Sequence, residues 1–140
     1  MACDLNAIIN QLRDKGWRLT PQRQMLLEAL HAAEGHIDAE TLWEQMVRRF
    51  PTISLSTVYR TLESLRDLGA ATETDLGLGR VQYHLASHGD HHHLLCRQCG
   101  VVLDLPSEEL APLRQRLLAR YGFDLGVNHL ALRGLCSGCR

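Results

Sequence analysis

The sequence has no apolar run that approaches the roughly 18 residues needed to span a membrane. Its N-terminus has no basic region followed by an apolar stretch and a cleavage site, so we expect a cytoplasmic protein with no membrane partner. It also has almost no net charge, since 15 Lys and Arg stand against 16 Asp and Glu. A charge of -1 argues against nucleic-acid binding on the usual rule, although the motifs below indicate otherwise. The 140 residues, 45% hydrophobic and 22% charged, exclude a disordered chain.

The first half of the chain reads as four amphipathic helices and a hairpin. Capping residues and apolar stripes of helical period predict helices over residues 5–15, 20–35, 38–50 and about 54–69. Two strands follow at Ala71–Asp75 and Arg80–Leu85, joined by Gly77-Leu78-Gly79. Helices followed by a two-stranded hairpin are typical of a winged helix-turn-helix domain, which we expect over residues 1–85.

The second half reads as a small α/β unit after a hinge at residues 86–90. We expect strands at Leu94–Cys96, Val101–Leu105 and Val127–Leu132, and a helix at Ser107–Arg120 capped by Ser107. Residues 91–140 are too few for a self-sufficient core, so this domain should need a metal, a partner subunit or both. The predicted fold is therefore α+β, with two domains.

Cysteine and histidine are the unusual residues, with 13 of 140 positions between them. Cys96/Cys99 and Cys136/Cys139 form two C-x2-C pairs, a spacing that brings four thiolates to one tetrahedral zinc ion. Two disulfides or two redox-active pairs are the alternatives, and a reducing cytosol disfavours the former. The remaining Cys3 has no assigned role.

A histidine run precedes the first cysteine pair. In an extended chain His91 and His93 share one face, and Asp90 and His92 share the other. Imidazole binds Zn, Fe, Co, Ni and Cu, so the ligand type alone does not choose a metal, and an exposed run without a metal is the alternative.

Four motifs together resemble the ferric uptake regulator family of metal-dependent transcription repressors, and the match covers nearly the whole chain. They are Arg18-Leu19-Thr20-Pro21-Gln22-Arg23, Ser56-Thr57-Val58-Tyr59-Arg60-Thr61-Leu62, the histidine run continuing into Leu94-Leu95-Cys96-Arg97-Gln98-Cys99-Gly100, and the final cysteine pair. The resemblance implies a homodimer with a structural zinc on the four cysteines.

The resemblance also implies a sensory metal site at the domain junction, built from His36, His84, His91 and His93. Asp104 matches a position that completes the site in peroxide-sensing relatives. Asp90, His92 and His129 match an additional site of many members, whose acidic position is Ala111 here, with Glu108 and Glu109 nearby.

The DNA-binding residues are expected on the fourth helix and near the start of the domain. Tyr59 and Arg60 lie opposite the apolar stripe of that helix, where matching residues of the family reach bases in the major groove. We expect phosphate and backbone contacts from a further set: Ser56, Thr57, Thr61, Arg13, Lys15, Arg18, Arg23 and Arg80.

The residues and the family resemblance together imply a dimeric repressor that binds an AT-rich palindromic operator of metal-homeostasis genes when zinc or iron occupies the sensory site. A peroxide sensor that oxidises a ligand histidine is the alternative within the family. A zinc enzyme is disfavoured because no H-E-x-x-H or H-x-E…P-C-x-x-C pattern is present. A metal-storage protein would not need Tyr59 or Arg60.

Overall fold

The computed structural model describes residues 4–33, 35–77, 79–88, 91–126 and 129–140. The chain divides into two compact units. The N-terminal unit comprises Met1–Glu73 and Arg80–His88, and the C-terminal unit comprises Thr74–Gly79 and Gly89–Arg140. Within the described ranges no helix is long and apolar enough to cross a membrane.

The N-terminal unit contains four helices, and each begins at a polar capping side chain. They are α1 (Leu5–Asp14), α2 (Pro21–Ala32), α3 (Ala39–Val47) and α4 (Leu55–Asp67). In each case the cap accepts a hydrogen bond from a backbone N–H of the first turn, which satisfies a donor that has no partner within the helix. These caps are Asp4, Thr20, Asp38 and Ser54.

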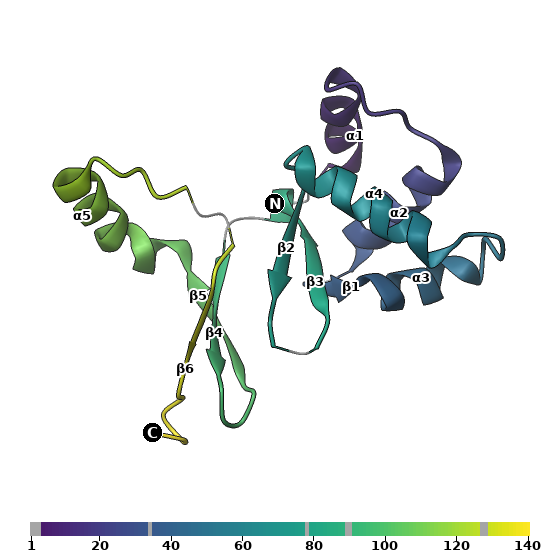
Figure 1. Cartoon of the computed structure of the whole chain (residues 1–140). Helices are drawn as coiled ribbons and strands as arrows, with labels where there is room; N and C mark the ends of the chain where they lie inside the picture. Colours follow the sequence, from purple (N-terminus) through teal and green to yellow (C-terminus); the bar gives the residue numbers. More distant parts are fainter. Residues whose placement is uncertain (1–3, 34, 78, 89–90, 127–128) are drawn as a thin grey trace. The chain divides into compact units, whose positions relative to one another are not determined.

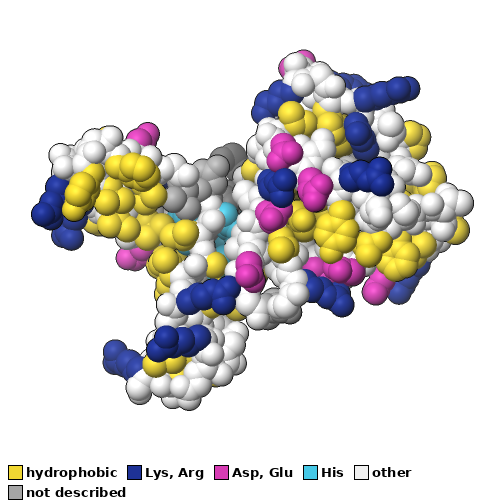
Figure 2. Space-filling model, in the orientation of Figure 1, with side chains coloured by type: hydrophobic (Ala, Val, Ile, Leu, Met, Phe, Trp, Pro, Cys, Tyr) yellow, Lys and Arg dark blue, Asp and Glu magenta, His cyan; other side chains and the backbone are white. Residues whose placement is uncertain are grey.

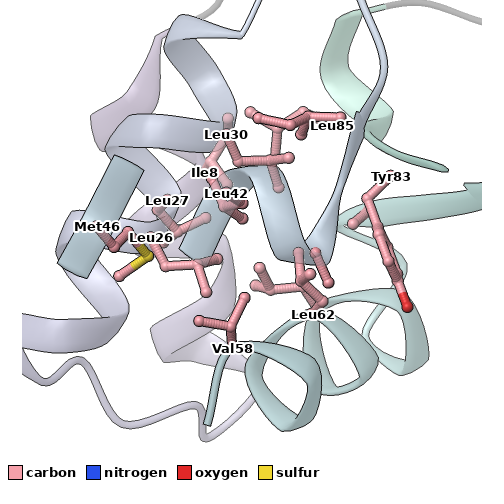
Figure 3. Close-up of a cluster of buried hydrophobic side chains, with 14 of the residues drawn as sticks. Ile8, Leu26, Leu27, Leu30, Leu42, Met46, Val58, Leu62, Tyr83 and Leu85 are labelled. Carbon is pink, nitrogen blue, oxygen red and sulfur yellow. The ribbon is translucent and has the colours of Figure 1, made fainter. Parts of the chain in front are cut away.

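The apolar faces of these helices meet in one hydrophobic core, part of which is drawn in Figure 3. Leu27, Leu42 and Leu62 are completely buried, and Leu85 brings a strand of the hairpin into the same cluster. The core therefore fixes α4 against α2, α3 and the hairpin.

A small antiparallel sheet completes the hairpin expected from the sequence. Its order is β1 (Ile37–Asp38), β3 (Val81–Leu85) and β2 (Ala71–Asp75). The two-residue strand β1 is too short to show any alternation and was not predicted. It pairs Ile37 with Tyr83 and Asp38 with Gln82, so the preceding histidine comes beside the hairpin.

The C-terminal unit is built on a second sheet with the order β5-β4-β6. Strand β4 (His91–Cys96) runs antiparallel to β5 (Val102–Pro106) and parallel to β6 (Ala131–Gly134) (Figure 1). Strand β4 begins three residues earlier than expected and includes the histidine run. Part of the predicted last strand, residues 127–128, lies outside the described residues.

The predicted helix at 107–120 is divided into two parts. Ser107–Leu110 is a 3-10 helix (η2), and α5 runs over Ala111–Tyr121. Pro112 has no N–H to donate to the preceding turn, which explains why the α-helix begins beside it rather than at Ser107. The expectation that Ser107 caps this helix is wrong, because Leu110 occupies the N-cap position of α5.

The predicted hinge at 86–90 contains a second 3-10 turn, η1 (Ala86–His88), and its residues 89 and 90 lie outside the described residues. The proposed boundaries at residues 85 and 91 stay a prediction.

Candidate metal centres and nucleic-acid interface

The four cysteines of the two C-x2-C pairs come together at one end of the C-terminal sheet. Cys96 ends β4, Cys136 follows β6, and the four sulfurs all lie within 4.8 Å of one another. The Sγ atoms of Cys99 and Cys136 are 3.7 Å apart, close to the edge of about 3.8 Å in a tetrahedron with Zn–S bonds of about 2.3 Å. All four are free thiols, as a metal site requires and a disulfide pair would not allow.

Backbone N–H groups prepare one of these sulfurs as an anion. The amides of Cys99, Cys136 and Gln98 point at the sulfur of Cys96 and lower the pKa of its thiol to about 5. Hydrogen bonds with the sulfurs of Cys136 and Cys99 raise the pKa of Cys139 to about 12. The Cys96 thiolate attracts a cation, which would then favour ionisation of the neighbouring thiols.

Three histidines of the C-terminal unit converge on one point. His91 and His93 lie on the same face of β4, and His129 comes two residues before β6. The Nε2 atom of His129 is 2.9 Å from that of His93 and 3.4 Å from that of His91. Their ring centroids are 4.7–4.8 Å apart, with the rings edge to face. This is the arrangement of a metal site rather than of an exposed histidine run.

Two of these rings are also held at their outer nitrogens. Asp104 lies opposite His93 in the β4–β5 ladder, and its carboxylate is 3.2 Å from His93 Nδ1. The hydroxyl of Thr74 contacts His129 Nδ1. Burial lowers the pKa of His93, and the neighbouring His91 lowers it further, while Asp104 acts in the opposite direction. The neutral form that a metal needs is therefore favoured.

Two other predicted histidine ligands belong to the N-terminal unit, and a third lies on the other face of β4. In the N-terminal unit, the rings of His36 and His84 stack with their centroids 5.1 Å apart, because β1 pairs with β3. His92 is buried on the opposite face of β4 from His91 and His93, and its Nδ1 accepts a hydrogen bond from the Leu130 amide. Asp90 lies outside the described residues.

Helix α4 presents part of the predicted DNA-binding set to solvent. Ser56 and Arg60 are exposed, and Thr57 and Tyr59 are half-buried. The Tyr59 hydroxyl donates to a carboxylate oxygen of Glu40 on α3 at 2.9 Å. Burial and this carboxylate raise the pKa of Tyr59, so the ring stays neutral and is held in one position.

Several other members of that set have partners within the protein. Lys15 donates to the carbonyl of Leu68 at 2.8 Å and so satisfies the C-terminal end of α4. Arg23 donates to the carbonyl of Arg18 and lies 4.9 Å from the centre of the Trp17 ring.

Thr61 is buried, and its hydroxyl donates to the carbonyl of Thr57. Arg80 lies 3.4 Å from the carboxylate of Asp38. Arg13 and Arg18 are exposed. A DNA contact by any of these residues stays a prediction.

Sequence reasoning missed two supporting residues and expected a third, His129, at another site. Glu40 and Thr74 carry no spacing signal, because each acts through a contact between distant segments. His129 was expected at an additional site, and only the register of β6 on β4 brings it to the other pair. For all three, pairing in space was the missing information.

The comparisons with known proteins agree with the motifs. The model of the "Ferric uptake regulator family" matches residues 14–133. A peroxide-responsive repressor PerR of Staphylococcus saprophyticus is 34% identical over 94% of this chain and 88% of its own length. A ferric uptake regulation protein of Synechococcus elongatus is 33% identical over 93% of this chain and 90% of its own length.

Among solved structures, the ferric uptake regulator of Vibrio cholerae superposes with a TM-score of 0.71 at 31% identity, covering 91% of this chain and 98% of its own. The resemblance inferred from the sequence is thus confirmed. This chain belongs to the ferric uptake regulator family of metal-dependent transcriptional repressors, which are not enzymes.

Proposed function

We propose that this chain is a homodimeric repressor of metal-homeostasis genes, which binds an AT-rich palindromic operator when zinc or iron occupies a histidine site. The observation that carries the proposal is the convergence of the Nε2 atoms of His91, His93 and His129 beside a separate four-cysteine cluster. The cysteine cluster takes a structural zinc, and the histidines take the regulatory ion.

The regulatory ion acts by joining the two domains. We propose that His36 and His84 supply ligands from the N-terminal unit, and that His91 and His93 supply them from the other. An ion bound by both domains stabilises only the arrangement in which all its ligands reach it. Metal therefore shifts the population toward that arrangement, by as much as its affinities for the two states differ.

The DNA-binding face is the exposed side of α4. Arg60 and Ser56 are available to phosphates and base edges, and the ring of Tyr59 can contact a thymine methyl group. The chain's net charge of -1 makes non-specific binding weak, so a modest metal-driven change in geometry is enough to decide operator occupancy.

A second copy of the chain is the expected partner of the C-terminal unit. All of α5 is at least partly exposed, including the apolar side chains of Leu113, Leu118 and Tyr121, and Figure 2 shows hydrophobic side chains gathered on this helix. A separate apolar groove of the same unit, beside β4, is lined by Leu94, Leu103 and other side chains. Apolar area of this extent is typical of a subunit interface.

Operator binding measured at buffered free concentrations of Zn²⁺, Fe²⁺, Mn²⁺ and Ni²⁺ tests this function. We expect the affinity for the operator to rise with Zn²⁺ or Fe²⁺. The His36→Ala variant should lose this rise, although it should still bind metal measurably in the absence of DNA. His31→Ala is the matched control on the same unit. An operator affinity that is the same with and without every metal would contradict the proposal.

A peroxide sensor of the same family is the second candidate, favoured by the similar identities to a peroxide-responsive repressor and to an iron regulator, and by Asp104 beside His93. In that case the iron-loaded protein treated with peroxide gains one oxygen on a ligand histidine and releases the operator. Mass spectrometry of the peptides that contain His36, His84, His91, His93 and His129 decides between the two functions.

A further inference from the structure

The position of His129 points to a different ligand set from the one that the family resemblance implies. That resemblance pairs it with Asp90 and His92 at an additional site. We propose instead that His129 is a ligand of the regulatory metal, so that the C-terminal unit by itself holds the ion through the imidazoles of His91, His93 and His129. This inference rests on the proposed function and names the ligands of that same site.

The distances fit one ion. In a tetrahedral site with Zn–N bonds of about 2.0–2.1 Å, ligand nitrogens are about 3.4 Å apart. The His129 and His91 Nε2 atoms are 3.4 Å apart, and those of His129 and His93 are 2.9 Å apart, so a small outward movement of one ring admits the ion. All three atoms that meet are Nε2, the nitrogen remote from the backbone.

The outer nitrogens explain why these Nε2 atoms face inward. Asp104 holds Nδ1 of His93, which leaves the Nε2 lone pair of the neutral ring for a metal. The Thr74 hydroxyl contacts Nδ1 of His129 and can either donate or accept. It therefore supports His129 in the apo state, where Nε2–H can donate to His93, and in the metal-bound state, where Nδ1–H donates to Thr74.

His92 is excluded from this set by the strand it lies on. Its side chain points to the opposite face of β4, and its Nδ1 accepts the Leu130 N–H at 3.1 Å. Because Leu130 directly follows His129, the same bond directs these two histidines to opposite sides. His92 thus orders the backbone next to a ligand without being one at this site.

A three-histidine site in one unit implies that metal binds the two units in a fixed order. The C-terminal unit captures the ion first, and ligands from the N-terminal unit then complete its coordination. Loss of a ligand in the N-terminal unit should then separate metal binding from operator binding, whereas loss of His129 should weaken metal binding itself.

Cobalt(II) is the probe, added to full-length protein with zinc on the four cysteines. We expect X-ray absorption spectroscopy at the cobalt edge to show at least three imidazole ligands in the wild type and one fewer in His129→Asn. The cobalt affinity of His129→Asn should be at least about tenfold lower than that of the wild type. Thr74→Val should reduce cobalt affinity while keeping the imidazole count, since Thr74 positions a ligand. His92→Asn should keep the imidazole count, since His92 only orders the backbone beside His129. His31→Asn in the N-terminal unit is the matched control and should keep both imidazole count and affinity.

Zinc content and thermal unfolding establish that each variant folds. Wild-type cobalt affinity in a folded His129→Asn variant would overturn the proposal, as would loss of the site in His92→Asn alone. Either result leaves the proposed function intact, because that function fails only if operator binding by the wild type ignores the metal.

Discussion

The two units of this chain are stabilised in different ways. The N-terminal unit buries a continuous cluster of leucine, isoleucine and aromatic side chains from four helices and the hairpin. In the described part of the C-terminal unit, the buried hydrophobic residues are only Leu76, Leu95, Cys96 and Leu110. A hydrophobic core can maintain the first unit, whereas the second needs metal ligands and a partner subunit.

This difference indicates where metal can act. Helix α4 is capped by Ser54, hydrogen-bonded at its C-terminal end by Lys15 and joined to α3 through Tyr59. The surface that we expect to read DNA is therefore held by contacts among protein groups. Metal should change the C-terminal unit and the coupling between domains, not the fold of the DNA-binding domain.

Loss of the cysteine site should have the largest effect. In Cys99→Ser the C-terminal unit should lose its fold, because binding of a structural zinc contributes about 10–16 kcal/mol to folding. Hydrogen exchange should show loss of protection in residues 91–134 and unchanged protection in α2 and α4. Cys3→Ser is the control. Unfolding of both units together would show that their stabilities are not separable.

A substitution in the hydrophobic core should destabilise the N-terminal unit and leave the C-terminal unit unchanged. Leu27→Ala removes a completely buried side chain and should lower the free energy of unfolding of the N-terminal unit by about 2–5 kcal/mol. Zinc and cobalt binding by the C-terminal unit should be unchanged. Urea denaturation followed by the fluorescence of Trp17 and Trp43, both in the N-terminal unit, measures the first quantity, and metal titration measures the second.

The dependence on a partner can be tested on α5. Leu118 is 56% exposed, so Leu118→Lys should leave the monomer folded and raise the dimer dissociation constant about tenfold or more, equivalent to about 1.4 kcal/mol. Sedimentation at several protein concentrations measures this constant. Arg114→Lys on the same helix keeps the charge and is the control. An unchanged dimer would place the interface elsewhere.

A smaller effect is expected at the cap of α3. Partial burial raises the pKa of Asp38, but hydrogen bonds from Thr41 and the charge of Arg80 outweigh it, and the pKa lies below its ordinary value of 3.8. This stabilisation is present above the unfolded pKa and is lost as pH falls through the lower folded pKa. Asp38→Ala should cost about 1 kcal/mol at pH 7.

Asp38→Asn should keep most of the cap at pH 7 and flatten the loss of stability as pH falls below 3.8, the ordinary pKa of the carboxyl group, since asparagine caps equally well without a charge. Chemical denaturation across this range compares the two variants. The same acid dependence in both would mean that other carboxylates control it.

The sequence predicted the elements whose signals are local. Capping residues such as Thr20 and Ser54 placed helix starts to within a residue or two, and the cysteine spacing predicted a cluster that the structure forms. The helix expected from Ser107 begins instead at Ala111, because a proline is favoured in the first turn of a helix and not within it.

What the sequence could not predict depends on pairing between segments far apart in the chain. His129 meets His93 because His93 pairs with Ala131 in a parallel ladder, and no local pattern specifies that register. Strand β1 exists only because β3 lies beside it. Lys15 is a basic surface residue in the sequence, and its bond to Leu68 requires the packing of α1 against the end of α4.

Strand β6 constrains how the length of the chain can vary. Its four residues lie between His129 on one side and Cys136 on the other, while β4 carries His93 and Cys96 in the same order. One residue inserted within β6 would turn every later side chain to the other face and carry Cys136 about 3.3 Å along the strand. An insertion between α5 and His129 would leave the register of both His129 and Cys136 with β4 unchanged. The number of residues from His129 to Cys136 thus fixes the distance between the two metal centres along β6.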